Sequence, residues 1–349
     1  MRRTIALSLF AAALLVLTWG RAELQPIDPT APVTAELVAQ GAAGGEPSES
    51  PLSLAAVWQL DSRTRDFGGY SALIALPDGS LLAGSDSGTL LHIEQPGTAA
   101  MSGSYPQLAA TEGRDKRDAD LEALTLDRAT GAIWAGYERS NAIERYSPRL
   151  ERLGRVEPAR MQDWRANGGP EAMVRLADGR FVVLAEVRRR PAAQGHRAVL
   201  FPGDPTAGDA AGEGVAFAFA APAGMRPVDM TQLADGTVLV LLRRLEWYLP
   251  PDFASAVAVL DPEAIEAIEA GALWHPERVL PLPDGVPSEN YEGLASEPGA
   301  DGTTRLWLIS DDNFTGLQRT LLVALDWHAP ERPRQKARGN AARPSANRN

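Results

Sequence analysis

Short apolar runs recur along the chain in pairs, and a turn joins the two runs of each pair. A polar or acidic residue opens the first run, and an Asp-Gly or Thr-Gly step follows it. The five copies begin at Ser71, Glu122, Glu171, Asp229 and Glu292. Asp-Gly supplies the positive φ that a tight hairpin turn requires, so each pair predicts two antiparallel strands. A repeat of about fifty residues with this content predicts an all-β fold, a β-propeller with one blade per copy.

The number of copies favours five blades. A sixth blade would need a further sheet in the long insertion between the third and fourth copies. The fifth copy supplies only three strands, at Gly293–Glu297, Arg305–Ile309 and Thr320–Asp326. We expect the N-terminal run Leu54–Asp61 to supply the fourth by pairing with Leu321–Asp326, because an unclosed ring would expose sheet edges.

One helix is expected outside this strand pattern, at Pro262–Ala270. Asp261 precedes it as an N-cap and Gly271 follows it as the residue that ends it. Its position after the third strand of the fourth copy makes it an addition to the blade rather than part of the core.

The two ends of the chain differ from the body. A basic start, an apolar run and the sequence Gly20-Arg21-Ala22 predict a signal peptide over residues 1–22. The apolar run is short for a membrane span, so we expect export to the periplasm or medium without stable membrane insertion; an uncleaved anchor is the alternative. Composition predicts a flexible linker at residues 23–52, the propeller at 53–328 and a disordered basic tail at 329–349.

Charge and cysteine content exclude several classes of protein. The 349 residues carry a net charge of −11, and both ends are basic, so the body is strongly acidic. Such a surface repels nucleic acid, and we expect no nucleic-acid partner. The chain has no cysteine, which excludes disulfides, thiolate metal sites and a cysteine nucleophile. We expect a monomer that acts on a small molecule.

The acids that open the repeats are the main candidate for chemistry. In a propeller the first strand of each blade lines the central channel, so Glu122, Glu171, Asp229 and Glu292 should meet at one mouth. The next strand ends near the same place, and it adds a second polar set: Asp86, Glu138, Glu186, Arg243 or Arg244, and Asp311 or Asp312. Converging carboxylates favour a hard cation, Ca²⁺ before Zn²⁺; the alternative is that each acid caps a loop.

Arginines accompany these acids along the chain. Arg226, Arg243 and Arg244 are candidates for binding an anionic group, since a guanidinium matches phosphate or carboxylate oxygens. The alternative is ion pairing with the neighbouring acids. Asp311 and Asp312 either ligate a cation or cap the turn that they begin. A Ser-His-Asp triad is not expected, because the histidines lie far from Ser71 in this arrangement.

Several segments resemble a known bacterial family, the phytase-like proteins described as "esterase-like activity of phytase". The resemblance lies in FGGYSALIALPDGSLLAGSD, DADLEALTLD, NGGPEAMVRLADGRFVVLAE, MRPVDMTQLADGTVLVLLRR and ENYEGLASEPGADGTTRLWLISDDNFTGLQRTLLVALDW. It covers residues 54–327 and is most specific in the last segment. The resemblance implies a propeller, export, and ester or phosphoester hydrolysis with acidic residues that bind calcium.

Residues and resemblance together predict an exported hydrolase of phosphate esters or other esters. In this hypothesis Glu122, Glu171, Asp229 and Glu292, with Asp311 and Asp312, hold Ca²⁺, and Arg226, Arg243 or Arg244 bind the substrate's anionic group. Glu171 and Glu292 are also the candidate catalytic acids. Two alternatives remain: a non-catalytic propeller that binds a ligand or protein, and a lactonase-like propeller that uses Ca²⁺ and one acid as a base.

Overall fold

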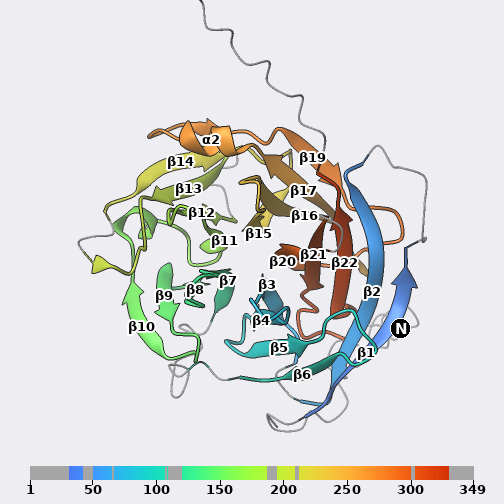
Figure 1. The fold of residues 1–349 in the computed structure, drawn as a ribbon. Coiled ribbons are helices and arrows are strands. Elements are labelled where there is room, and N and C mark those ends of the chain that lie inside the picture. The colour runs from blue at the N-terminus through green and yellow to red at the C-terminus, as the bar shows by residue number, and fades with distance from the viewer. Residues whose placement is uncertain are drawn as a thin grey trace, which may run out of the picture.

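The computed structural model describes residues 31–41, 50–64, 67–106, 108, 120–186, 195–208, 212–299 and 303–329. Within them five β-sheets stand around a common central axis, and the ring is visible end-on in Figure 1. The predicted five-bladed propeller is therefore confirmed, and no sixth sheet occurs in the described part of the chain. The predicted signal peptide at 1–22 and the tail from residue 330 lie outside the described residues.

Blades one and two are simple four-stranded meanders. The strands of the first are β3 (Tyr70–Ala75), β4 (Leu81–Ser85), β5 (Leu90–Glu94) and β6 (Ser102–Ser104). Those of the second are β7 (Leu121–Leu126), β8 (Ile133–Tyr137), β9 (Ala142–Tyr146) and β10 (Arg152–Val156). A short 3₁₀ helix, η2 (Ala159–Met161), follows β10.

Blade three gains a fifth strand from the segment that joins two strands of blade four. Blade three contains β11 (Pro170–Arg175), β12 (Phe181–Ala185), β13 (His196–Phe201) and β14 (Val215–Phe219). Blade four contains β15 (Arg226–Gln232), β16 (Val238–Tyr248), β17 (Pro251–Leu260) and β19 (Arg278–Pro281). Between β17 and β19 the chain adds β18 (Leu273–Trp274) in parallel to β14. The insertion thus extends blade three and does not form a new blade.

The predicted helix is present but shorter than expected. Helix α2 spans Pro262–Glu266 and ends before Ala270. Its N-cap is as predicted, since the Asp261 side chain accepts a hydrogen bond from the backbone N–H of Glu263. The chain leaves the helix early because the following segment turns towards β18, where Trp274 packs edge-on against Phe217 with ring centroids 5.8 Å apart.

The N-terminal segment closes the ring as predicted. Blade five contains β20 (Tyr291–Pro298), β21 (Thr304–Ser310) and β22 (Leu321–Trp327), and its fourth strand is β2 (Leu52–Ser62). β2 runs antiparallel to β22, with Leu54 opposite Leu325 and Gln59 opposite Leu321. Figure 1 shows the blue β2 beside the red β22. The first and last parts of the chain therefore share one sheet.

One part of the predicted linker is wrong. Residues Val33–Gln40 form β1, a fifth strand on the outer edge of blade five, paired antiparallel to β2. The Pro- and Gly-rich composition around this segment suggested a linker. The segment becomes a strand because β2 offers it a free edge, which sequence composition does not reveal. Residues 23–30 and 42–49 of the predicted linker lie outside the described residues.

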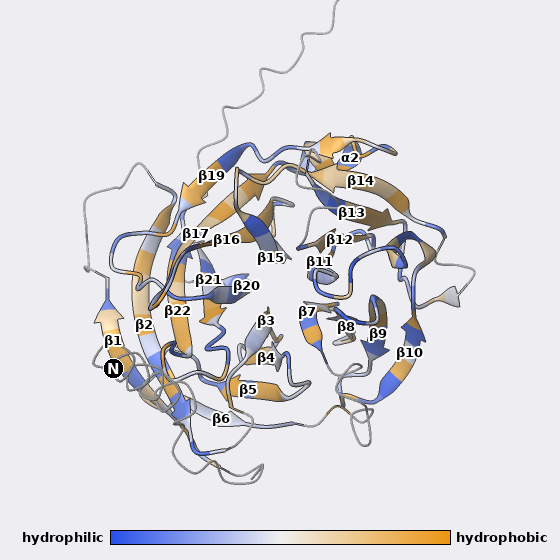
Figure 2. Cartoon of the chain, turned by 180° about the vertical axis from the view of Figure 1, so that it is seen from behind, coloured by the Kyte–Doolittle hydropathy of each residue, from blue (hydrophilic) through white to orange (hydrophobic). Residues whose placement is uncertain are grey.

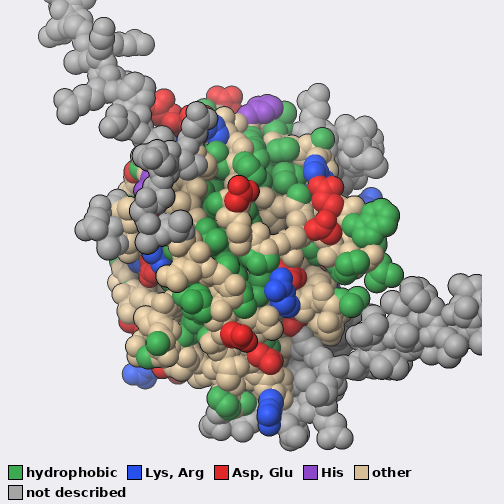
Figure 3. Space-filling model, turned by 90° about the vertical axis from the view of Figure 1, so that its right-hand side faces the viewer, with side chains coloured by type: hydrophobic (Ala, Val, Ile, Leu, Met, Phe, Trp, Pro, Cys, Tyr) green, Lys and Arg blue, Asp and Glu red, His purple; other side chains and the backbone are tan. Residues whose placement is uncertain are grey.

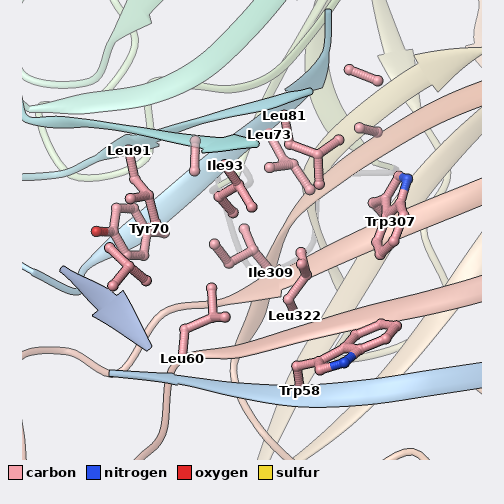
Figure 4. Packing of buried hydrophobic residues seen from close by; sticks show 14 of the residues in the cluster. Trp58, Leu60, Tyr70, Leu73, Leu81, Leu91, Ile93, Trp307, Ile309 and Leu322 are labelled. Atoms are coloured by element: carbon pink, nitrogen blue, oxygen red, sulfur yellow. The ribbon is translucent and has the colours of Figure 1, made fainter. Parts of the chain in front are cut away.

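The core lies between neighbouring blades. The described residues contain five buried hydrophobic clusters, and each joins one pair of adjacent blades, including the pair formed by blades five and one. Figure 4 shows this closing interface, where Trp58 and Trp307 of blade five face Leu73 and Leu81 of blade one. Figure 2 shows the hydrophobic colour along strands such as β5, β14 and β22. Burial of this apolar area holds the ring shut without any covalent link.

Candidate functional site

Polar side chains gather around the central axis at one end of the propeller, where each first strand begins and each second strand ends, and we call this end the polar mouth of the channel. In every blade the pairing of these two strands skips one residue of the first strand: Ser71, Glu122, Glu171, Val228 and Glu292. A skipped residue is a β-bulge, which bends the strand and redirects its side chain. Glu122, Glu171 and Glu292 lie close to one another there. The charge of Glu292 raises the pKa of Glu122, and the charge of Glu122 raises the pKa of Glu171.

Asp229 does not belong to this ring of bulges. The bulge residue of blade four is Val228, which precedes Gly236 at the same spacing as Glu171 precedes Gly179. Asp229 therefore occupies the position of Ala172 in blade three. Because side chains alternate along a strand, a shift of one residue gives Asp229 a different environment from the bulge acids.

The Asp229 carboxylate is fully buried and hydrogen-bonded to three main-chain N–H groups. It accepts bonds from Met230 (2.8 Å), Leu294 (2.6 Å) and Leu73 (3.4 Å). Leu73 lies in blade one and Asp229 in blade four, which are not neighbours, so this contact crosses the channel. Asp229 thus supplies acceptors for the inner edges of two other blades, and we leave it out of the candidate cation site.

Side chains also bridge the channel farther from the mouth. Arg128 of blade two donates to the main-chain carbonyl of Ser296 in blade five at 2.5 Å. The hydroxyls of Thr231 and Ser296 lie 2.8 Å apart and join blades four and five. These contacts and Asp229 tie the blades together beneath the mouth, so the mouth is the end at which a ligand would meet the acids.

Arginine partners two of the acids at the mouth. The Nη2 atom of Arg243 lies 2.8 Å from Glu292 and 3.1 Å from Glu186. Arg226, opposite Arg243 in the ladder, also pairs with Glu186 at 3.1 Å and leaves 55% of its side chain exposed. Burial lowers the pKa of Arg243, but the surrounding carboxylates outweigh it and raise that pKa. Arg243 is therefore a fixed positive charge between blades three, four and five.

Arg244 is not brought into this cluster. It pairs with Glu246, and its Nη1 atom donates to the carbonyl of Ala223 at 3.3 Å. Neighbouring residues of a strand point to opposite faces, so Arg243 and Arg244 cannot both face the mouth in a regular strand. The sequence left the choice between them open, and the structure selects Arg243.

The acids on blade two have fewer positively charged partners than Glu186 and Glu292. Carboxylate oxygens of Asp120, Glu122 and Glu138 all lie within 4.8 Å of one another, and we call these residues the blade-two acids. Asp120 pairs with Arg139 at 2.5 Å, and Glu138 shares a hydrogen bond with Glu171 of blade three. Two carboxyl groups can share such a bond only with a proton between them, which is a sign of crowded negative charge.

Glu122 is the least compensated of these acids. Only 9% of the residue is exposed, yet its side chain has no hydrogen bond or ion pair with any described residue. Burial is the main cause that raises its pKa well above the usual value, and Glu292, Glu138, Asp120 and Asp86 raise it further. A buried carboxylate without a partner is costly, so Glu122 is suited to a positively charged ligand.

Asp311 and Asp312 separate into two roles. Asp312 accepts bonds from the N–H groups of Gly69 (3.2 Å) and Phe314 (3.0 Å) and from the Thr320 hydroxyl (3.1 Å). It therefore caps two loops, as in the simpler of the two alternatives. A Cβ on Gly68, whose φ is +114°, would lie 2.4 Å from Asp312, which explains the double glycine of the FGGY segment.

Asp311 stays close to the mouth. The buried side chain of Asn290 donates to both Asp311 (3.1 Å) and Glu292 (2.7 Å), and it joins the two acids. Burial, and then the charge of Glu292, raise the pKa of Asp311 well above its usual value. Asp311 is thus held beside Glu292 in blade five.

Sequence reasoning missed two members of the site, Asp120 and Asn290. Each stands two residues before a bulge acid, in Asp120-Leu121-Glu122 and Asn290-Tyr291-Glu292. The signal was available, because a polar residue recurs at this position while the residue between is apolar and buried. A pattern of polar, apolar, acidic at a repeat start therefore marks the mouth in blades two and five, although Glu171 follows Gly169-Pro170.

A serine nucleophile is the usual alternative for an esterase, and one Ser-His-Asp contact occurs in the part of the chain that the structure describes. The Ser80 hydroxyl lies 2.8 Å from Nε2 of His92 and donates to Asp78 at 2.6 Å. In a catalytic triad the histidine stands between the serine and the acid, whereas here the serine stands between them. The group also lies at the β3–β4 turn, at the opposite end of the blade from the acids.

The crowded acids make stability depend on pH. Burial is the first cause that raises the pKa of Glu122, Glu138, Glu171 and Glu292. A carboxyl whose folded pKa is raised stabilises the fold below its unfolded pKa of about 4.3, and this stabilisation is lost as pH rises through the folded value. In chelator we expect the free energy of unfolding to fall as pH rises above the unfolded pKa of about 4.3.

Urea unfolding at a series of pH values measures this decline, and Glu122→Gln should flatten it. Acids with a lowered pKa, such as Asp178, behave in the opposite way, because their contribution to the free energy of unfolding is lost only as pH falls. A wild-type free energy of unfolding that rises steadily as pH increases above about 4.3 would contradict the arrangement of the acids.

Comparisons with known proteins give one family and several distant structural neighbours. A family model described as phytase-like, "esterase-like activity of phytase", matches residues 65–314. No curated protein matches the chain. Among solved structures, a putative oxidoreductase (glucose dehydrogenase) of Thermus thermophilus is 14% identical, with a TM-score of 0.40 over 74% of this chain and 97% of that chain.

Two further solved structures are similar at the same level. One is a nidogen/laminin complex, 9% identical, with a TM-score of 0.42 over 76% of this chain and 93% of that chain. The other is a hypothetical protein of Leishmania major, 14% identical, with a TM-score of 0.39 over 76% and 88%. The family match spans the polar mouth from Ser71 to Asp312, so the chain belongs to the phytase-like family described as "esterase-like activity of phytase".

Proposed function

We propose that this protein is a calcium-dependent hydrolase of phosphate esters or other esters that acts at the polar mouth of the propeller. The observation that carries the proposal is Glu122, a buried carboxylate without a partner among the described residues, within 4.8 Å of two further acids. Membership of a family named for esterase-like activity supports a hydrolase. The proposal names no individual substrate.

The blade-two acids fit a calcium ion. Asp120, Glu122 and Glu138 offer hard oxygen atoms close together, and Glu171 adjoins them through Glu138. Calcium prefers several carboxylate oxygens, and the described residues place no histidine among these acids. A bound Ca²⁺ would polarise the ester or phosphoryl oxygen and favour ionisation of a bound water. Asp229 and Asp312 are not assigned to the cation, because Asp229 accepts three main-chain hydrogen bonds and Asp312 accepts two, together with one from the Thr320 hydroxyl.

The remaining residues of the mouth bind and orient the substrate. Arg226, half-exposed beside Glu186, offers its guanidinium to an anionic group of the substrate. Arg243 holds Glu186 and Glu292 in fixed positions, so that Glu292 can accept a proton from a water at the mouth. Asn290 orients Glu292 from the other side. The positive charge of Arg243 also stabilises negative charge that develops during hydrolysis.

Hydrolysis of p-nitrophenyl phosphate, p-nitrophenyl acetate and a simple lactone, with Ca²⁺ or with chelator, tests the proposal. We expect turnover of at least one ester class that chelator abolishes, and a loss of kcat/KM of about 10²-fold or more in Glu122→Gln, the usual size for losing an electrostatic stabiliser. Asp178→Asn, on the turn after β11, is the control and should retain activity.

The panel also separates the alternatives. Turnover of the lactone alone would favour a lactonase-like activity. The absence of turnover of all three compounds in the presence of Ca²⁺ would overturn the hydrolase and favour a propeller that only binds a ligand. Activity that persists in chelator would exclude the cation from the reaction.

We also propose that the protein is exported to the periplasm or medium, on the basis of the signal-like segment at residues 1–22. Among the described residues, no helix has the length and apolarity needed to cross a membrane. N-terminal sequencing of the protein recovered from outside the cytoplasm tests this proposal, with Glu23 as the expected first residue. An intact Met1 on the recovered protein would favour an uncleaved anchor.

A further inference from the structure

Blade four carries a hairpin that extends beyond the polar mouth. β16 spans 11 residues and β17 spans 10, whereas the second strands of blades one, two and three have 5 each. The ladder between them continues from Arg243, at the mouth, to the pair Tyr248 and Pro251. We call residues 244–254, which make up this extension, the arm.

The end of the arm is apolar and exposed. Trp247, Tyr248 and Leu249 are 65%, 83% and 47% exposed, and no charged residue occurs between Glu246 and Asp252. Turns at the tips of hairpins are normally polar, so three consecutive large apolar side chains need a reason. A raised group of hydrophobic side chains is also seen at one edge of the surface in Figure 3.

The arm is held in place and is connected to the site. The Trp247 ring N–H donates to the carbonyl of Leu249 at 2.9 Å, which fixes the indole at the tip. At the base, the Ser288 hydroxyl binds both the N–H and the carbonyl of Phe253, at 2.9 and 3.0 Å. Ser288 begins the short segment that leads to Asn290 and Glu292 at the mouth. The arm and the candidate active site therefore share their supporting backbone.

The length of the arm limits which substrates can contact both the polar mouth and the tip of the arm. Strands rise about 3.3 Å per residue, so Trp247 and Tyr248, four and five residues after Arg243, stand about 13–17 Å beyond it. A small polar substrate cannot touch the mouth and the tip together. An ester with an extended apolar group can do so, because its reacting group would lie at the mouth and its apolar group along the arm.

The charge of the mouth agrees with this class of substrate. Acids outnumber arginines among the residues that meet there, and the chain as a whole carries −11. A polyanion such as a highly phosphorylated polyol would be repelled even after one calcium ion had bound. A neutral or singly charged ester avoids most of this repulsion and gains apolar contact instead.

We infer that the arm is a substrate-recognition element, and that the protein prefers esters with a long or aromatic apolar group to polyanionic phosphate esters. The inference rests on the proposed hydrolase function. Trp247 and Tyr248 are its specificity-determining residues, and they bind the part of the substrate remote from the reacting bond. The reaction itself remains the one proposed above, in which water cleaves the ester bond.

Binding is tested without hydrolysis, so that the two proposals can fail separately. Every other tryptophan in the described part of the chain is at most 9% exposed, so Trp247 dominates any change in indole environment. With Ca²⁺ present, dodecylphosphonate below its micelle concentration should shift the emission to shorter wavelength, and methylphosphonate should not. The shift should disappear in Trp247→Phe, and affinity should fall about tenfold or more in the double variant Trp247→Ser, Tyr248→Ser.

Hydrolysis of p-nitrophenyl acetate, octanoate and dodecanoate gives the second readout. We expect KM to fall as the chain lengthens in the wild type, and to be nearly independent of chain length in the double variant. If the long esters bind but no ester is hydrolysed, the proposed function fails and the inference stands. If all esters are hydrolysed without any chain-length preference, the inference fails alone.

Two other occupants of the arm are distinguished by the same fluorescence measurement. A shift caused by phosphatidylcholine vesicles but not by monomeric dodecylphosphonate would assign the arm to a bilayer surface and overturn the inference. A shift that appears on raising the protein concentration alone would assign it to a second copy of the chain, with the same consequence. The double variant should fold normally, since the side chains it changes are exposed.

Discussion

Replacing Asp229 by alanine is expected to lower the free energy of unfolding by about 3–5 kcal/mol, because three buried N–H groups lose their acceptor. Asp229 is completely buried, and its carboxylate accepts from Met230 in its own blade and from Leu73 and Leu294 in two others. No water is expected to replace it easily at a position where three blades converge. Urea-induced unfolding of wild type and variant measures the difference.

Two further variants make this result specific. Asp284→Ala removes an exposed acid of the same type and should change the free energy of unfolding by less than about 0.5 kcal/mol. Asp229→Asn keeps one acceptor oxygen, which can still serve Leu73 and Leu294, and should therefore cost less than alanine. An alanine variant as stable as the wild type would show that the contacts across the channel contribute little to closing the ring.

Calcium is expected to raise the melting temperature of the wild type, and Glu122→Gln with Glu138→Gln should abolish the increase. Binding to the folded form alone stabilises it by about 2.7 kcal/mol when the free ion is at about a hundred times its Kd. For a domain of this size that corresponds to a rise of several degrees. The blade-two acids carry the effect, because Glu122 has no competing partner among the described residues.

The control variants locate the ion. Glu292→Gln should retain most of the calcium effect, since Glu292 already pairs with Arg243 and Asn290. Asp178→Asn changes an acid far from the mouth and reports diffuse binding to the acidic surface. A calcium effect that survives in the Glu122, Glu138 double variant but disappears in Glu292→Gln would move the site to the side of Asp311. No effect in the wild type would remove the cation from the proposed function.

The repeat pattern located the candidate site, but in blade four it was wrong by one residue, and this error placed Asp229 among the acids of the mouth. Counting back from the Asp-Gly turn aligns Glu171 with Val228. The sequence prediction instead included Asp229, the acidic residue that follows Val228. The bulge itself cannot be recognised in a single sequence, because it depends on how two strands pair. The same limit applies to Arg243 and Arg244, whose facing is set by the continued ladder between β16 and β17.

Local sequence determined the turns, the strand order, the five blades and the N-cap of α2, because each depends on residues close together in the chain. It also predicted the closing pair β2 and β22, because a ring has only one unpaired position to fill. The tertiary structure alone decided the partners of buried charges: Asp229 with main-chain N–H groups, Glu292 with Arg243, and Glu122 with none among the described residues. Apart from the contact of Asp229 with Met230, these pairings join residues more than 45 positions apart, so their energies depend on how the blades pack and cannot be read from any local pattern.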